Sequence, residues 1–128
     1  MVLISYSFAA GTNGRVTREA SGITFSSTGA SFNELHRRSD AQPRDPYNKY
    51  EDKWDDFNNA NNLDEKDGCY DKAMGMTQQV LIIDKDGTVT DVVADVDNAK
   101  SQCFRKSYLN VHFPAPPFAP FYLFLQMH

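Results

Sequence analysis

The sequence predicts a small α+β domain in which an antiparallel sheet is packed by two to three helices. Three stretches carry this prediction: a helical stripe of aromatic residues from Tyr47 to Phe57, two β-prone runs around the turn at Asp86-Gly87, and an apolar run from Phe121 to Met127. A chain of 128 residues is long enough for one hydrophobic core, so we expect residues 1–128 to form a single domain.

The first part, residues 1–44, is expected to be rich in β-hairpin structure. Apolar and polar residues alternate over Val2–Phe8, which favours a strand, and Gly11–Gly14 supplies turn residues with positive φ. Ser31–Arg38 is expected to form one or two helical turns. The breaker-rich stretch Ser39–Pro46 is expected to be a loop.

The second part, residues 45–68, is expected to hold an amphipathic helix and a loop. Asp45 is a plausible N-cap and Pro46 a plausible first helical residue. The asparagine-rich run Asn58–Asn62 should end the helix, because asparagine tolerates left-handed geometry. Four aromatic residues share one face at helical spacing, which favours a core position over an interaction stripe: Tyr47, Tyr50, Trp54 and Phe57.

The third part, residues 69–127, begins with an expected short helix over Cys69–Met76. A hairpin should follow, because two β-prone runs, Val80–Ile83 and Thr88–Val96, flank the turn residues Lys85-Asp86-Gly87.

A further helix should start after Asp97 or Asn98, either of which can cap it, and should end before the prolines of "PAPP". The last strand, Phe121–Met127, has apolar residues on both faces, so both faces should be covered. The third part therefore reads as helix, strand, strand, helix and strand.

This order of elements resembles the C-terminal domain of TonB-type energy transducers. The resemblance rests on "VLIIDKDGTVTDVVADV", on "CFRKSYLNVHFPAPP" with its aromatic-proline element, and on the final apolar strand. It covers Cys69–Met127, whereas residues 1–68 match no pattern of the family. It implies an α/β fold in the bacterial envelope and protein binding by strand addition. Full transducers also carry a membrane anchor and a proline-rich linker that this sequence lacks, so force transmission is not expected.

In that family a partner's extended segment typically adds to the C-terminal strand, which assigns partner binding here to Phe121, Tyr122, Leu123, Phe124, Leu125 and Gln126. A free strand edge offers unpaired N–H and C=O groups to such a segment. The odd-numbered residues of this strand should face one side of the sheet and the even-numbered residues the other. We expect a proline at Leu123 or Phe124 to abolish partner binding.

The two cysteines, Cys69 and Cys103, can be a redox pair or one structural disulfide. They do not form a C-x-x-C motif, and each falls in a predicted helix beside the same hairpin. Given the envelope setting that the resemblance implies, we predict a Cys69–Cys103 disulfide.

Motifs for metal binding and catalysis are weak. Asp84–Gly87 could suggest a calcium loop, but Ile82 and Val93 occupy positions where an EF-hand needs oxygen ligands, so a hairpin turn is preferred. The histidines lack zinc-binding spacing, and no G-x-S-x-G motif is present. We therefore predict a non-enzyme with no metal and no cofactor. A small hydrolase whose catalytic residues meet only in space stays open as a third hypothesis.

The net charge of −4 argues against nucleic-acid and anionic-membrane binding, and no apolar run is long enough to span a membrane. Acidic residues gather between Asp45 and Asp67, where they would either be a solvated face or steer a basic partner. We predict a periplasmic or secreted bacterial protein that binds another protein, such as an envelope receptor. The alternative is a periplasmic immunity protein that neutralises a secreted toxin enzyme, such as a cell-wall hydrolase or lipase.

Overall fold

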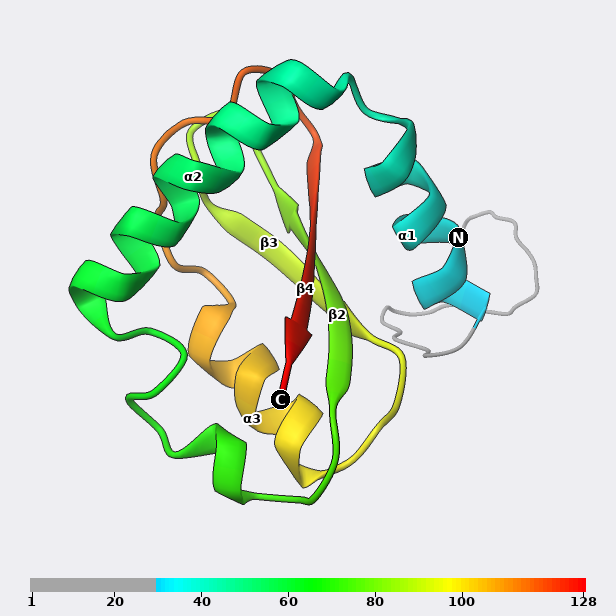
Figure 1. Cartoon of the computed structure of the whole chain (residues 1–128), viewed down its shortest axis with the longest axis vertical. Coiled ribbons are helices and arrows are strands. Elements are labelled where there is room, and N and C mark those ends of the chain that lie inside the picture. Colours follow the sequence, from blue (N-terminus) through cyan, green and yellow to red (C-terminus); the bar gives the residue numbers. More distant parts are fainter. Residues whose placement is uncertain (1–29) are drawn as a thin grey trace.

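The computed structural model describes residues 30–128, which form helices and one antiparallel sheet, as an α+β protein does (Figure 1). The strand predicted at Val2–Phe8 and the turn at Gly11–Gly14 lie outside the described residues. In chain order the elements are α1 (Ala30–Ala41), α2 (Arg44–Asn61), the 3-10 helix η1 (Cys69–Asp71), β2 (Thr77–Ile83), β3 (Val89–Ala94), α3 (Ala99–Tyr108) and β4 (Phe121–Met127).

The sheet has the strand order β3-β2-β4, with β2 in the centre and both of its neighbours antiparallel to it. Leu81 on β2 lies opposite Val92 on β3 and Leu123 on β4. All three residues are buried, and their side chains belong to one hydrophobic cluster. This register places β4 at one edge of the described sheet.

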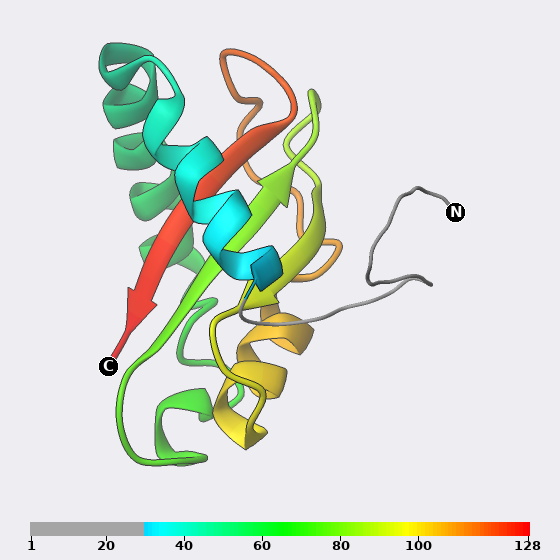
Figure 2. The same ribbon diagram turned by 90° about the vertical axis from the view of Figure 1, so that its right-hand side faces the viewer.

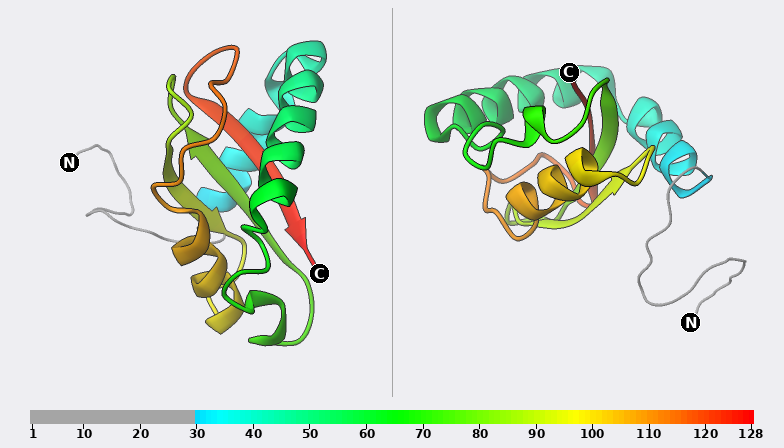
Figure 3. Two further views of the ribbon diagram at one scale, coloured as in Figure 1. Left: turned by 90° about the vertical axis from the view of Figure 1, so that its left-hand side faces the viewer. Right: turned by 90° about the horizontal axis from the view of Figure 1, so that it is seen from below.

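Helices cover both faces of the sheet. Helix α1 crosses one face, whereas α2 and α3 lie on the opposite face (Figures 2 and 3). The main core lies on the α2 and α3 side and includes Phe121 and Leu123 of β4. A smaller cluster lies under α1 and joins Phe32 to Val80 and Val93, with Phe124 packed against it. The expected alternation of β4 side chains between two covered faces therefore holds at these positions.

Helix α2 is the amphipathic helix that the aromatic stripe predicts. Tyr47, Tyr50 and Trp54 are buried in the main core, so the stripe is core as expected. The helix ends at Asn61, and Asn62 takes the left-handed conformation with φ 51°. It starts at Arg44 with Pro43 in the cap position, so the predicted cap at Asp45 and first helical residue at Pro46 are each two residues too late.

Two local predictions are wrong. The expected loop over Ser39–Pro46 consists only of Gln42 and Pro43, because α1 continues to Ala41 and α2 already starts at Arg44. Pro46 is tolerated in the first turn of α2, since an N–H at that position has no helical partner. The expected helix over Cys69–Met76 is helical only over Cys69–Asp71. Gly75, with φ 88°, is incompatible with a right-handed helix.

The hairpin and α3 follow their local signals. Gly87 has φ 94°, and the Asp84 carboxylate accepts the N–H groups of Asp86 and Thr88, which closes the turn. The side chain of Asn98 accepts the N–H of Ser101, and the Ser101 hydroxyl accepts the N–H of Asn98, which together cap α3. Within residues 30–128, the search for a helix able to cross a membrane finds none.

Candidate functional site

Strand β4 is an edge strand within the described sheet. It pairs with β2 along all seven of its residues, from Phe121 opposite Ile83 to Met127 opposite Thr77. No described strand lies on its other side. The backbone groups that point to that side are therefore the candidate site.

Two side chains from the α1–α2 corner identify the outward groups. The Gln42 amide accepts a hydrogen bond of 2.9 Å from the Tyr122 N–H and donates one of 2.7 Å to the Tyr122 carbonyl. Two positions further along, the Phe124 N–H donates to the Tyr47 hydroxyl at 3.1 Å. Because strand geometry repeats every two residues, the backbone groups of Tyr122, Phe124 and Gln126 all point away from β2.

The outward edge of β4 is therefore divided into two halves. The half at Tyr122 is closed by Gln42. In the other half, residues 30–128 provide no strand neighbour and no hydrogen-bond partner for the Phe124 carbonyl or for the N–H and C=O of Gln126. Gln126 is also exposed. This half can accept the main chain of an extended segment.

Aromatic side chains hold β4 firmly on both of its faces. On the α1 side, the His36 ring stacks on Phe124 with a centroid distance of 4.0 Å and an interplanar angle of 7°. On the α2 side, Tyr47 stacks on Phe121 at 5.3 Å. Arg38 adds a hydrogen bond of 3.2 Å to the Tyr122 hydroxyl. The edge is thus presented by a strand whose position is fixed before any partner arrives.

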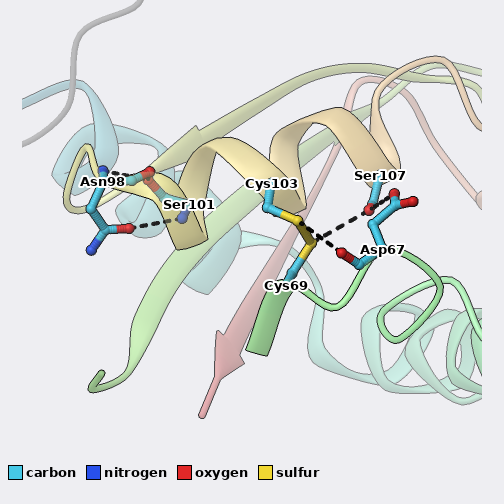
Figure 4. The surroundings of a disulfide bond; sticks show 6 residues. All are labelled: Asp67, Cys69, Asn98, Ser101, Cys103 and Ser107. Carbon is cyan, nitrogen blue, oxygen red and sulfur yellow. Dashed lines mark hydrogen bonds between the residues drawn. A yellow bond between two sulfur atoms is a disulfide. The ribbon is translucent and has the colours of Figure 1, made fainter. Parts of the chain in front are cut away.

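The two cysteines form a disulfide, as predicted (Figure 4). Cys69 on η1 is fully buried and Cys103 on α3 is half-buried, and their Cα atoms lie 5.4 Å apart. Ser107 donates a hydrogen bond of 2.6 Å to the Asp67 carboxylate, and its hydroxyl oxygen lies 3.6 Å from the Cys69 sulfur. The bridge therefore fastens η1 to α3.

The hairpin turn carries a chain of polar groups that resembles a catalytic set only in composition. The Thr88 hydroxyl donates to Asp86 at 2.8 Å and also lies 2.8 Å from Nδ1 of His112. A nucleophilic hydroxyl gives its proton to the imidazole, whereas this one gives it to a carboxylate. Hydrogen bonds with Asp84 and then Thr88 lower the pKa of Asp86 to about 2. The arrangement closes a turn and does not activate the hydroxyl.

A pocket of about 370 Å³ lies beside this turn and has a mixed lining. Ile82, Ala119 and Pro120 contribute apolar surface, and Asp84 and Lys85 contribute charges of opposite sign. Among residues 30–128, no group of three or more His, Cys, Asp or Glu side chains is arranged to hold a metal ion.

The exposed face of α2 is acidic. It carries Glu51, Asp52, Asp55 and Asp56, of which only Glu51 is half-buried. Desolvation by surrounding protein atoms, and then the neighbouring carboxylates, raise the pKa of Glu51 and of Asp55. The cluster of negative charges on this face would attract a basic surface.

Sequence reasoning missed the part that Gln42 plays at the edge. It placed Tyr47 in the core but could not foresee its bond to the β4 backbone. Gln42 and Tyr122 are 80 positions apart, and a glutamine before a proline carries no local signal for such a contact.

Comparisons of this chain with known proteins identify no related protein. No protein-family model matches the chain, and searches of curated proteins and of solved structures find no match either.

Proposed function

We propose that this protein is a non-catalytic binding module that takes up an extended segment of a partner protein at the outer edge of β4. The observation that carries the proposal is that the described residues provide no partner for the Phe124 carbonyl or for the N–H and C=O of Gln126. Main-chain hydrogen bonds would supply the affinity, and the side chains on the two faces would supply specificity. The order of elements from Cys69 to Met127, which resembles a TonB C-terminal domain, supports the same use of the last strand.

The disulfide supports a periplasmic or secreted location. Disulfides persist in oxidising compartments and are rare in the cytosol of most organisms. The Cys69–Cys103 bridge leaves no cysteine thiol free among residues 30–128. An envelope receptor is the partner class that the resemblance favours.

A proline at Gln126 tests the proposal. The Gln126 N–H points outward, so Gln126→Pro removes a docking donor without touching the ladder to β2. The earlier choice of Leu123 is unsuitable because its N–H points to β2, and Phe124 is unsuitable because its N–H is bound by Tyr47. The matched control, Gln126→Ala, keeps the N–H and removes only the exposed side chain.

The partner is first captured from a bacterial envelope extract, identified and purified, and its affinity for each variant is then measured by calorimetry. We expect Gln126→Ala to bind as the parent does and Gln126→Pro to bind at least about tenfold more weakly, because it loses a main-chain hydrogen bond and its ring obstructs pairing. Unchanged affinity of a folded Gln126→Pro variant would exclude β4 as the docking edge.

The acidic face of α2 favours a second candidate, an immunity protein that inhibits a basic toxin enzyme. In this case Asp52→Asn together with Asp56→Asn should weaken binding, more so at low salt, whereas Gln126→Pro should leave it unchanged. The captured enzyme should also lose activity on adding the protein. A partner that has no enzymatic activity, or that binds the doubly substituted variant normally, would rule this candidate out.

A further inference from the structure

We infer that the Gln42 side chain competes with a partner strand for the edge of β4, so that its detachment controls how tightly an extended segment binds. This inference rests on the proposed function. The Gln42 side-chain amide accepts a hydrogen bond of 2.9 Å from the Tyr122 N–H and donates one of 2.7 Å to the Tyr122 carbonyl. In an antiparallel ladder, one residue of the neighbouring strand makes the same two bonds. Gln42 therefore stands where that residue would lie.

The consequence for binding is a limit on the length of the added strand. With Gln42 attached, an incoming strand can pair only with the half of the edge from Phe124 to Gln126. A longer strand needs the two bonds at Tyr122, which become available only when the amide leaves. At Phe124 the longer strand bonds to the carbonyl alone, because Tyr47 holds the N–H. Its apparent affinity is then reduced by the fraction of molecules in which Gln42 is detached.

Detachment of Gln42 is feasible because it needs only a rotation of this half-buried side chain. The backbone of the corner can stay in place: Ser39 is 1% exposed, and its hydroxyl donates to the Tyr47 hydroxyl of the main core. The Gln42 amide also has a second acceptor, the Ser39 carbonyl at 3.1 Å, within its own corner. Its donor group therefore keeps a hydrogen bond when it releases Tyr122.

The probe is a fluorescent peptide that carries the β2 sequence, Thr77–Ile83, between lysine pairs for solubility. In the fold this sequence pairs antiparallel with all of β4, and β4 presents the same two faces to a neighbour on either side. A second peptide, N-methylated at every other residue, cannot form the ladder and controls for charge attraction. Binding is followed by fluorescence anisotropy.

Four proteins are compared: the parent, Gln42→Ala, Gln42→Asn and Asn33→Ala. The asparagine variant keeps the amide but shortens its reach. Asn33 is an exposed residue of α1 and serves as the control for an alanine on this helix. Amide hydrogen exchange on the free proteins shows whether each one is folded. In both Gln42 variants the Tyr122 amide should exchange faster, while the Leu123 amide, which points to β2, should stay protected.

We expect both Gln42 variants to bind the peptide at least about tenfold more tightly than the parent and Asn33→Ala, because two further main-chain hydrogen bonds, each contributing about fivefold, become available at Tyr122. The N-methylated peptide should bind none of them. Equal binding by all four proteins would overturn the competition by Gln42 while leaving strand addition intact. Weaker binding by the Gln42 variants would also overturn it. Failure of every protein to bind would overturn both the competition and the proposed docking edge.

Discussion

The ammonium group of Lys100 donates a hydrogen bond of 2.7 Å to the backbone carbonyl of His128. It also donates to the carbonyl of Gly75. The Lys100 residue is only 1% exposed, so this charge is held inside the protein by two carbonyl oxygens. The contact fastens the first turn of α3 to the end of β4 and to the loop before β2. It therefore steadies the end of β4 whose outer edge has no described strand neighbour.

Replacement of Lys100 by methionine should lower the free energy of unfolding by about 1–3 kcal/mol, because two carbonyl groups lose a charged donor. The methionine fills a similar volume, so a cavity does not confound the result. Urea denaturation measures the loss, and hydrogen exchange should be faster at Met127. Lys106→Met, at an exposed position of the same helix, is the control and should change stability by less than about 0.5 kcal/mol. Equal stability of the two variants would contradict this account of Lys100.

Loss of the disulfide should lower the free energy of unfolding by about 2–4 kcal/mol, chiefly because the unfolded chain gains freedom. The double variant Cys69→Ala/Cys103→Ala should show this loss without reductant. Adding a reductant should destabilise the parent and leave the double variant unchanged. Alkylation of the native parent should block neither sulfur, as judged by mass; labelling of both would contradict the bridge.

Gly87 and Gly75 form a matched pair for testing backbone geometry. Both have positive φ, 94° and 88°, so an alanine is strained at either position. A Cβ on Gly75 would meet nothing within 4 Å, whereas a Cβ on Gly87 would lie 1.9 Å from the Phe113 carbonyl oxygen. Gly75→Ala should therefore cost about 1–2 kcal/mol of stability, the strain alone. Gly87→Ala should cost clearly more, because the bond from the Phe113 N–H to the Gly87 carbonyl must also shift. Thermal unfolding of both variants measures the difference, and equal losses would contradict the close approach.

The acidic face of α2 gives a prediction about pH. The pKa of Asp55 is raised in the folded protein, so at neutral pH its charge destabilises the fold relative to the unfolded chain. Asp55→Asn should therefore be more stable than the parent at pH 7, by roughly a few tenths of a kcal/mol because the group is exposed and screened.

The advantage of Asp55→Asn should shrink as the pH falls through the raised pKa, because the parent then takes up a proton and loses both the desolvation cost of its charge and the repulsion from Asp52 and Asp56. Urea denaturation at several pH values follows this change. Asp71→Asn, which removes an exposed carboxylate of η1, is the control for net charge. An advantage that grows with acidity would have the wrong sign and would contradict the assignment.

The elements that the sequence predicts correctly are those with local physical signals. The hairpin depends on Asp84 and Gly87, which close its turn by themselves, and α3 depends on Asn98, whose side chain caps it. The end of α2 at Asn61 lies within the asparagine run that predicted it, whereas its start is two residues earlier than Asp45 and Pro46 indicated. The prediction fails at Gly75. Its neighbours follow a helical pattern, but its positive φ cannot be part of a right-handed helix.

The candidate site was only partly predictable, because its geometry depends on contacts between distant segments. The alternation of β4 residues between two faces follows from strand periodicity. The division of its outer edge depends on the Gln42 amide and the Tyr47 hydroxyl, which approach β4 from the α1–α2 corner. No pattern in the neighbourhood of Gln42 or of Tyr122 encodes that approach.

The corner that closes half of the edge also bears on the solubility of the protein at high concentration. The segment Phe121–Met127 is aromatic and aliphatic and has neither a charge nor a proline. Segments of this kind stack into cross-β fibrils when their edges are left open to other copies. The side chains of Gln42 and Tyr47 interrupt such stacking at its first two rungs, since they occupy the N–H groups of Tyr122 and Phe124. We therefore expect the same two contacts to hinder fibril formation between copies of the protein.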